Sequence, residues 1–155
     1  MFQLIVDNTI NLRLLEIHEA TSAFQLIDQN RMYLKEWLPW VDQIISPYQY
    51  HSIIPQWHQQ FIENNGFEAG IFFNEKLVGM ISLQQVDWKN RQASIGYFLD
   101  EASQGKGIMQ KTVISVLNYA FYYLHLNRIE IRCCLNNIKS MAIQERLQFN
   151  KEGII

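Results

Sequence analysis

A chain of 155 residues is long enough to bury the core of one domain. Hydrophobic residues make up 48% and charged residues 18%, a balance typical of a folded protein rather than a disordered one. The formal charge of −2 and the lack of a basic run argue against nucleic acid as a ligand. No apolar run approaches the ~20 residues that span a bilayer, so no membrane partner is expected.

The N-terminal residues and the cysteines bear on the compartment. Residues 1–7 contain no basic segment followed by a long apolar one, so no secretory signal is predicted. Cys133 and Cys134 are the only cysteines, and adjacent side chains on a strand point to opposite faces. A disulfide between them is therefore not expected. Two packing thiols fit a reducing cytoplasm.

The first half of the chain reads mainly as helices. Leu12 and Leu14 alternate with polar neighbours, which indicates a short strand. The spacing then predicts a helix over 17–37, which Pro39 ends, so that residues 37–42 form a loop or a single turn.

A second helix is predicted over 47–64. Ser46 is a good N-cap and Pro47 suits the first helical turn. Pro55 lies inside the pattern, so a kink or a break is expected there.

From Gly66 onward strands and helices alternate. The sequence predicts strands over 67–73 and 76–83 joined by a hairpin at Asn74-Glu75, and a further strand over 92–99. A helix with Val113, Val116 and Ala120 on its apolar face follows, then a strand over 128–135 and a helix over 140–147. This order favours a mixed sheet with a βαβ crossing, an α/β or α+β layer. No repeat or linker divides the chain, so residues 1–155 are expected to form a single domain.

A glycine-paired turn joins the 92–99 strand to the next helix. Gly105 and Gly107 lack a Cβ, so the backbone there can approach an anion closely, and a helix N-terminus follows at once. A P-loop is excluded because Glu101 stands where its first glycine belongs, and Gln110 breaks a dinucleotide fingerprint. The turn predicts a pyrophosphate site; a plain strand-to-helix turn with two glycines is the alternative.

The segment Gln104-Gly105-Lys106-Gly107-Ile108-Met109 resembles the acetyl-CoA pyrophosphate loop of the GNAT N-acetyltransferases, Gln/Arg-x-x-Gly-x-Gly/Ala, with Met109 departing at the last position. Gly-Lys-Gly-Ile-Met is typical of the branch that acetylates ribosomal-protein N-termini, the RimJ/RimL type. Further blocks extend the resemblance over nearly the whole chain: residues 30–42, 87–97, 126–132 and 137–147. The resemblance implies the GNAT fold, with a central, mostly antiparallel sheet that is splayed at the cofactor strand and flanked by helices.

The same resemblance implies the site residues. Acetyl-CoA would be the cosubstrate, and no metal is implied. Its pyrophosphate would be held by backbone N–H groups of residues 104–109, with Lys106 either adding charge or standing in solvent. Phe98 and Leu99 would offer backbone hydrogen bonds to the pantetheine arm. Asn137 would hold the same arm, unless it only caps the last helix.

Amide formation needs a group that takes a proton from the ammonium and one that protonates the thiolate. Ser140 is the candidate proton donor by resemblance, with a simple first-turn serine as the alternative. Ser94 stands where many family members have a glutamate, and a hydroxyl is not a base at neutral pH. Water relays to Asp42 or Asp87 are the remaining guesses.

The other candidates for chemistry are weak. The four histidines form no metal-ligand pattern, since His51 and His58 are two helical turns apart. Trp37, Trp40 and Trp57 fit the core or the walls of an acceptor groove better than a platform that stacks nucleic-acid bases.

The sequence departs from the resemblance mainly at its end. Leu147-Gln148-Phe149 replaces a Leu-Gly-Phe, and the family's C-terminal strand pair is missing after Ile155. A naturally short relative, a piece of a longer protein, or a homo-oligomer that completes its sheet between copies would each explain this. The sequence therefore predicts an acetyl-CoA-dependent N-acetyltransferase acting on a protein N-terminus, with impaired transfer if strands are lost. The alternatives are a non-catalytic acyl-CoA-binding remnant and an acetyltransferase for small amines.

Overall fold

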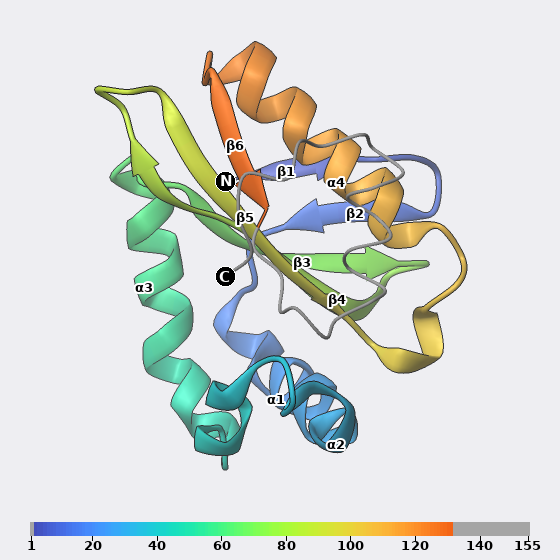
Figure 1. Ribbon diagram of the computed structural model, residues 1–155. Coiled ribbons are helices and arrows are strands. Elements are labelled where there is room, and N and C mark those ends of the chain that lie inside the picture. The colour runs from blue at the N-terminus through green and yellow to red at the C-terminus, as the bar shows by residue number, and fades with distance from the viewer. Residues whose placement is uncertain (1, 132–155) are drawn as a thin grey trace.

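The computed structural model describes residues 2–131, and its centre is one six-stranded sheet (Figure 1). The strands lie side by side in sequence order: β1 (Gln3–Ile5), β2 (Ile10–Arg13), β3 (Phe67–Phe73), β4 (Lys76–Asp87), β5 (Gln92–Leu99) and β6 (Arg128–Ile131). All neighbours are antiparallel except β5 and β6, which run parallel. This confirms the predicted mixed, mostly antiparallel sheet; strand β1 was not predicted.

The hairpin between β3 and β4 has the predicted turn. Asn74 and Glu75 both lie in the left-handed region, with φ of +49° and +68°. Positive φ at both central residues defines the type I′ turn, whose twist matches that of paired strands. The following strand continues to Asp87, beyond its predicted end at residue 83.

The predicted βαβ crossing is formed by β5, α4 (Ile108–Asn118) and β6. Helix α4 continues as one π-helical turn over Tyr119–Tyr123 before the chain enters β6. Parallel pairing is described from Gln92 opposite Arg128 to Ile95 opposite Ile131. The rest of the predicted 128–135 strand, the splay beside it and the helix predicted over 140–147 lie outside the described residues.

The single helix predicted over 17–37 is wrong. The structure instead has a 3-10 turn, η1 (Ile17–Glu19), then α1 (Ala20–Gln29) and α2 (Arg31–Leu34). Asn30 separates the two helices with φ −114° and ψ 14°. Its side-chain amide donates to the Leu26 carbonyl oxygen at 2.8 Å, so the side chain competes with the helical backbone and stops it.

The second helical region begins as predicted and has no break at Pro55. A 3-10 turn, η2 (Pro39–Gln43), is followed by η3 (Pro47–Gln49) and α3 (Tyr50–Ile62). The Ser46 hydroxyl caps η3 by accepting from the Tyr48 N–H at 3.2 Å. Helix α3 runs unbroken through Pro55, which is exposed, so water can hydrate the carbonyl that proline leaves unpaired.

Hydrophobic cores cover both faces of the sheet, with α4 on one face and α1 and α3 on the other (Figure 1). The α4 core includes Leu12, Ile71, Ile95 and Val113. The core under α1 and α3 includes Leu15, Ile27, Ile54 and Met80. Within residues 2–131, no helix has the length and apolar character needed to cross a membrane.

Candidate active site

The segment between β5 and α4 contains two glycines in the left-handed region. After β5, the Asp100 carboxylate accepts from the Ala102 N–H at 3.2 Å and starts one 3-10 turn, η4 (Glu101–Ser103). Gly105 and Gly107 follow with φ of +79° and +75°, and Gly107 is the N-cap of α4. Residues with a Cβ rarely adopt this conformation, so the path of the loop depends on both glycines.

This loop has a series of unused hydrogen-bond donors. Within residues 2–131, the backbone N–H groups of residues 105–109 donate to no other protein group. A Cβ built on Gly105 or Gly107 would meet nothing within 4 Å, so the space above the loop is open. Consecutive free N–H groups at the N-terminus of an eleven-residue helix are suited to a phosphate or another anion.

Most side chains of the predicted cofactor residues are occupied within the protein. Leu99, Ile108 and Met109 are buried in the α4 core, so only their backbone groups can reach a ligand. Lys106 lies with Nζ 5.7 Å from the centroid of the Phe73 ring. The Gln104 amide donates to the Leu99 carbonyl at 3.4 Å.

The glycine loop is also tied to the break between α1 and α2. The Gln104 amide donates to the Tyr33 hydroxyl at 3.1 Å. The Asn30 side-chain oxygen accepts from the Glu101 N–H at 3.1 Å. Asn30 therefore ends α1 and anchors the loop after β5 at the same time.

A cavity of about 320 Å³ lies between the sheet and helices α1 and α3. Its floor comes from β3, β4 and β5: Glu68, Met80, Ser82, Gln84, Gly96, Tyr97 and Phe98. Its walls include two of the tryptophans predicted as groove walls, Trp40 and Trp57. Trp40 contacts Phe98 edge to face, with ring centroids 6.1 Å apart. Since Phe98 is the next-to-last residue of β5, the cavity adjoins the strand that leads into the glycine loop.

Glu68 is a site residue that the sequence reasoning missed. Its partly buried side chain lines the cavity, and desolvation by burial raises the pKa of its carboxyl from 4.5 to about 7. Among residues 2–131, no group forms a hydrogen bond or ion pair with it. The available signal was a single carboxylate within the otherwise apolar strand 67–73.

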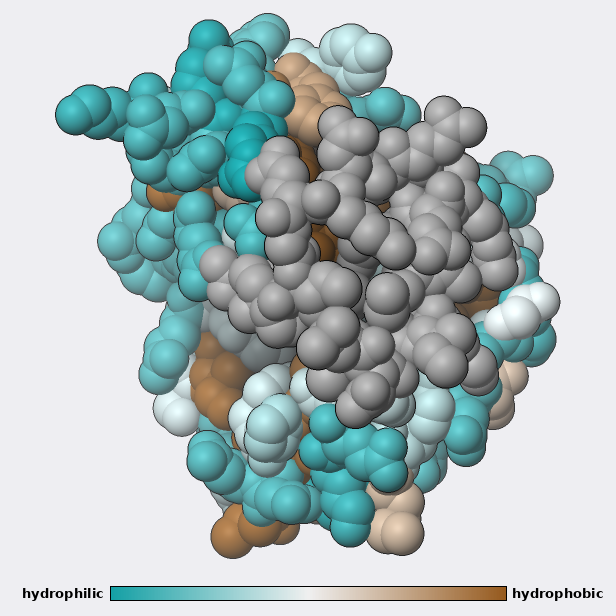
Figure 2. Space-filling model, viewed as in Figure 1, coloured by the Kyte–Doolittle hydropathy of each residue, from teal (hydrophilic) through white to brown (hydrophobic). Residues whose placement is uncertain are grey.

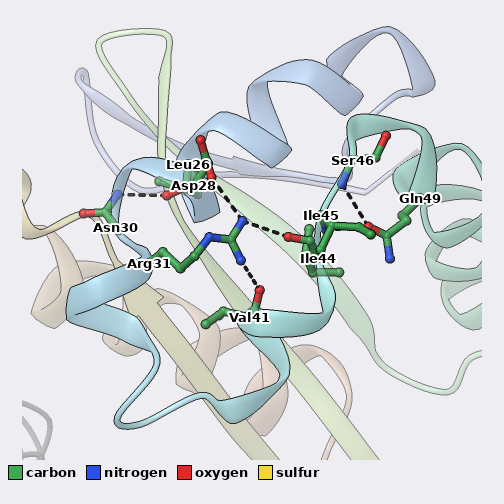
Figure 3. A network of polar contacts seen from close by, with 9 residues as sticks. All are labelled: Leu26, Asp28, Asn30, Arg31, Val41, Ile44, Ile45, Ser46 and Gln49. Carbon is green, nitrogen blue, oxygen red and sulfur yellow. Dashed lines mark hydrogen bonds and ion pairs between the residues drawn. The ribbon is translucent and has the colours of Figure 1, made fainter.

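The segment that carries Trp40 is held by Arg31 (Figure 3). The guanidinium donates to the carbonyl oxygens of Val41 at 2.5 Å and Ile44 at 2.8 Å, and pairs with Asp28 at 3.1 Å. A rigid fork with several donors is needed to bind two carbonyls that are three residues apart. Through these bonds Arg31 fixes the segment that forms the outer wall of the cavity.

The other predicted catalytic groups fall elsewhere. Ser94 is buried, and its hydroxyl donates to the Gln85 side-chain oxygen at 3.3 Å. Asp87 accepts hydrogen bonds from the Asn90 backbone and side chain, and neither Asp87 nor the exposed Asp42 lines the cavity. Asn137 and Ser140 lie outside the described residues.

The structure also places two of the histidines. His58 Nε2 forms a hydrogen bond with the Leu15 carbonyl oxygen at 2.6 Å, which links α3 to the segment that follows β2. The ring of His51 lies 5.6 Å from that of Tyr48. No group of three or more His, Cys, Asp or Glu side chains within residues 2–131 is placed to hold a metal ion.

The candidate site thus consists of a strand, a glycine loop with free backbone donors and a helix, and an apolar cavity lies beside it. The family model of the acetyltransferase (GNAT) domain matches residues 9–150. The chain belongs to the GNAT acetyltransferase family. It is an acyltransferase, and the predicted family and fold are confirmed.

Relatives and solved structures cover this GNAT chain almost completely. YdaF of Bacillus subtilis (strain 168), provisionally named a ribosomal N-acetyltransferase, is 40% identical over 99% of this chain and 84% of its own length. The structure of RimL, a ribosomal L7/L12 alpha-N-protein acetyltransferase in complex with coenzyme A, superposes with a TM-score of 0.92 at 25% identity. That match covers 98% of this chain and 86% of RimL.

A third neighbour has a different named role. The microcin C7 self-immunity acetyltransferase MccE, in complex with acetyl-CoA and AMP, gives a TM-score of 0.88 at 26% identity. The match covers 96% of this chain and 82% of MccE. The fold is therefore shared by acetyltransferases that differ in what they bind beside the cofactor.

Proposed function

We propose that this GNAT enzyme transfers the acetyl group of acetyl-CoA to a primary amine, and that the amine is a protein N-terminus. The observation that carries the proposal is the run of free backbone N–H groups over residues 105–109, in open space at the end of β5. The pyrophosphate of acetyl-CoA carries the negative charge that such donors bind. RimL and MccE, which share the fold, were solved with coenzyme A and acetyl-CoA.

Roles can be assigned to the predicted residues on this basis. Residues 104–109 bind the pyrophosphate through their backbone, and the backbone of Phe98 and Leu99 binds the pantetheine arm. Asn137 holds the same arm, and Ser140 protonates the departing thiolate; both assignments rest on the resemblance alone. We infer that residues 1–155 form one domain, in line with the match over 9–150, and that the enzyme works in the cytoplasm.

A protein N-terminus is favoured as acceptor by the cavity and by the relatives. The cavity of about 320 Å³ is walled by aromatic side chains and can admit the first residue of an extended chain. RimL is named an alpha-N-protein acetyltransferase, and YdaF is provisionally named for ribosomal substrates. MccE supports the small-molecule alternative, because acceptors are set by the walls of the site and not by the fold.

Calorimetric titration with acetyl-CoA, followed by a thiol-release assay with an amine panel, tests the proposal. The panel contains peptides with different N-terminal residues and small amines such as spermidine. Thiol release with peptides supports the proposed function, and release with small amines alone supports the small-molecule alternative. Binding without release would leave the non-catalytic alternative, and a lack of binding would refute the proposal.

The variant Gly107→Val tests whether the loop is the cofactor site. Valine is strained at φ +75° and adds a branched side chain above the free N–H groups, so the Kd for acetyl-CoA should rise at least tenfold. Asn118→Val, at the exposed far end of α4, is the matched control and should bind like the parent chain. Unchanged binding by Gly107→Val would mean that the cofactor binds elsewhere.

A further inference from the structure

Glu68 is the only charged side chain among the described residues that line the cavity. It lies near the start of β3, directly opposite Ser82 on β4, and Ser82 lies opposite Gly96 on β5. This row crosses the sheet from the carboxylate to the strand that leads into the glycine loop. Alternate residues of a strand share a face, so Glu68 lies on the same face as Phe72, which packs in the core under α1 and α3.

Among the described residues, no basic side chain lines the cavity around Glu68. Helix α3 contributes Tyr50 and Trp57 to the cavity, α1 contributes aliphatic side chains, and β5 contributes Tyr97. Burial raises the pKa of Tyr50 to about 12, so this phenol is neutral across the physiological range. The positive charge of Arg31 acts on Tyr50, but its guanidinium donates to backbone carbonyls and pairs with Asp28.

A carboxylate without a partner in an apolar cavity is unfavourable for folding. Its pKa is raised by burial to about 7, where a carboxyl is able to take up and release protons near neutral pH. Ionised Glu68 therefore destabilises the folded protein, but its carboxyl can exchange protons near neutral pH. An amine cation entering the cavity would provide the missing partner.

The cavity provides room for that cation next to β5, because Ser82 and Gly96 both line it. A Cβ on Gly96 would lie only 3.3 Å from the Ser82 hydroxyl and 3.4 Å from the Gln84 amide, so a side chain at this position would crowd the floor of the cavity. Neighbouring strands are about 4.8 Å apart, so an ammonium seated over Ser82 is one strand spacing from both β3 and β5. From that position the Glu68 side chain can reach it across one strand spacing, and it faces the strand proposed to carry the thioester.

We propose that Glu68 is the general base of this enzyme: its carboxylate binds the acceptor's ammonium in the cavity and takes one proton from it. This assignment rests on the proposed function. Ser94, on the same face of the sheet, cannot fill the role, because a hydroxyl is not a base at neutral pH and this one donates to Gln85.

One general base is enough to account for the proton taken from the acceptor's ammonium. The ammonium gives its first proton to the Glu68 carboxylate, and the free amine nitrogen attacks the thioester carbonyl carbon and forms the C–N bond. The C–S bond then breaks. The departing sulfur takes the proton that Ser140 is proposed above to donate, and the second proton of the nitrogen restores that hydroxyl, giving an amide and the CoA thiol. Glu68 releases its proton to water before the next cycle.

The substitution Glu68→Gln tests the assignment, with kcat/KM measured from pH 5 to 9 for an acceptor that the parent enzyme acetylates. We expect kcat/KM to fall about 100-fold or more. The decrease in kcat/KM with falling pH that centres near pH 7 in the parent, the limb on which Glu68 titrates, should disappear, while the change caused by titration of the acceptor amine should remain. The Kd for acetyl-CoA should change less than twofold. Glu63→Gln, at the exposed C-cap of α3, is the matched control and should leave the profile unchanged.

Glu68→Asp provides a second test that does not depend on the stability of the glutamine variant. It keeps a carboxylate, so it should retain the limb near pH 7 at a reduced rate. An unchanged limb and rate in Glu68→Gln, or weaker acetyl-CoA binding in either variant, would overturn the assignment. If the parent enzyme releases no thiol with any amine, the proposed function fails before any substitution is made, and the base assignment falls with it.

Discussion

Thr112 is fully buried in α4, yet its hydroxyl has no hydrogen-bond partner among residues 2–131. Valine has nearly the same shape without the polar group, so Thr112→Val should raise the free energy of unfolding by about 1 kcal/mol. Urea denaturation of both proteins measures this difference. Thr112→Ser removes a methyl group and keeps the hydroxyl, so it should be less stable than the parent. A valine variant less stable than the parent would mean that the hydroxyl is hydrogen-bonded.

Single residues of the site differ in how far the sequence predicts them. Gly105 and Gly107 were predictable, because a glycine pair after a strand has few uses other than positive φ and close approach. The packing of Gln104 on Tyr33 was not, since it joins residues 71 positions apart. Glu68 was missed because a single polar residue in a strand also fits an exposed face; only the cavity shows that this face is covered.

At the scale of elements, Arg31 determines where the η2 segment lies. Arg31→Lys keeps the charge but cannot donate to Val41 and Ile44 together, so the wall that carries Trp40 should loosen. We expect a stability loss of about 1 kcal/mol and a several-fold higher KM for the acceptor, with an unchanged Kd for acetyl-CoA. Lys35→Arg, an exposed change just after α2, serves as the matched control. A weaker cofactor Kd with an unaltered acceptor KM would refute this role.

Element boundaries could be predicted where their causes are local in the sequence, and not where they depend on distant residues. The hairpin at residues 74–75 and the cap at Ser46 were predicted because their causes are local. The break at Asn30 was not, because the side chain that ends α1 also accepts from Glu101, far along the chain. Strand β1 lies at the edge of the sheet and has only three residues, too few for an alternating pattern. The neighbouring Phe2 stacks on Phe67 with ring centroids 4.4 Å apart, a contact between residues far apart in the sequence.

Across the whole molecule, hydrophilic residues dominate the described part of the face in Figure 2, and hydrophobic residues form separate patches, several of them at its lower, helical end. Several apolar residues of that end are exposed: Met32 in α2, Ile45 before η3 and Tyr48 within it.

Two aspartates have a lowered pKa because of local hydrogen bonds. The Thr9 backbone N–H and hydroxyl lower the pKa of Asp7 to about 2, and hydrogen bonds from Asn90 lower that of Asp87.

These shifts predict a stability maximum on the acidic side of neutrality. Asp7 and Asp87 are more acidic in the folded chain, so their contribution is present above about pH 4 and is lost below it. Glu68 has the opposite sign. Its pKa rises from 4.5 to about 7 on folding, so the folded state binds the extra proton and stability falls as pH rises between those values. Thermal unfolding from pH 3 to 9, without ligand, measures the curve.

Glu68→Gln isolates the part of this curve that belongs to the cavity. Glutamine resembles the neutral carboxyl, so the two proteins should be about equally stable at pH 4. The glutamine variant should gain up to 2 to 3 kcal/mol over the parent by pH 8, as the parent's carboxyl ionises without a partner. Glu63→Gln, an exposed carboxyl, should show no such divergence. A constant difference between Glu68→Gln and the parent at every pH would mean that Glu68 ionises as freely in the cavity as in the unfolded chain. That result would remove the reason for placing the acceptor's ammonium beside it.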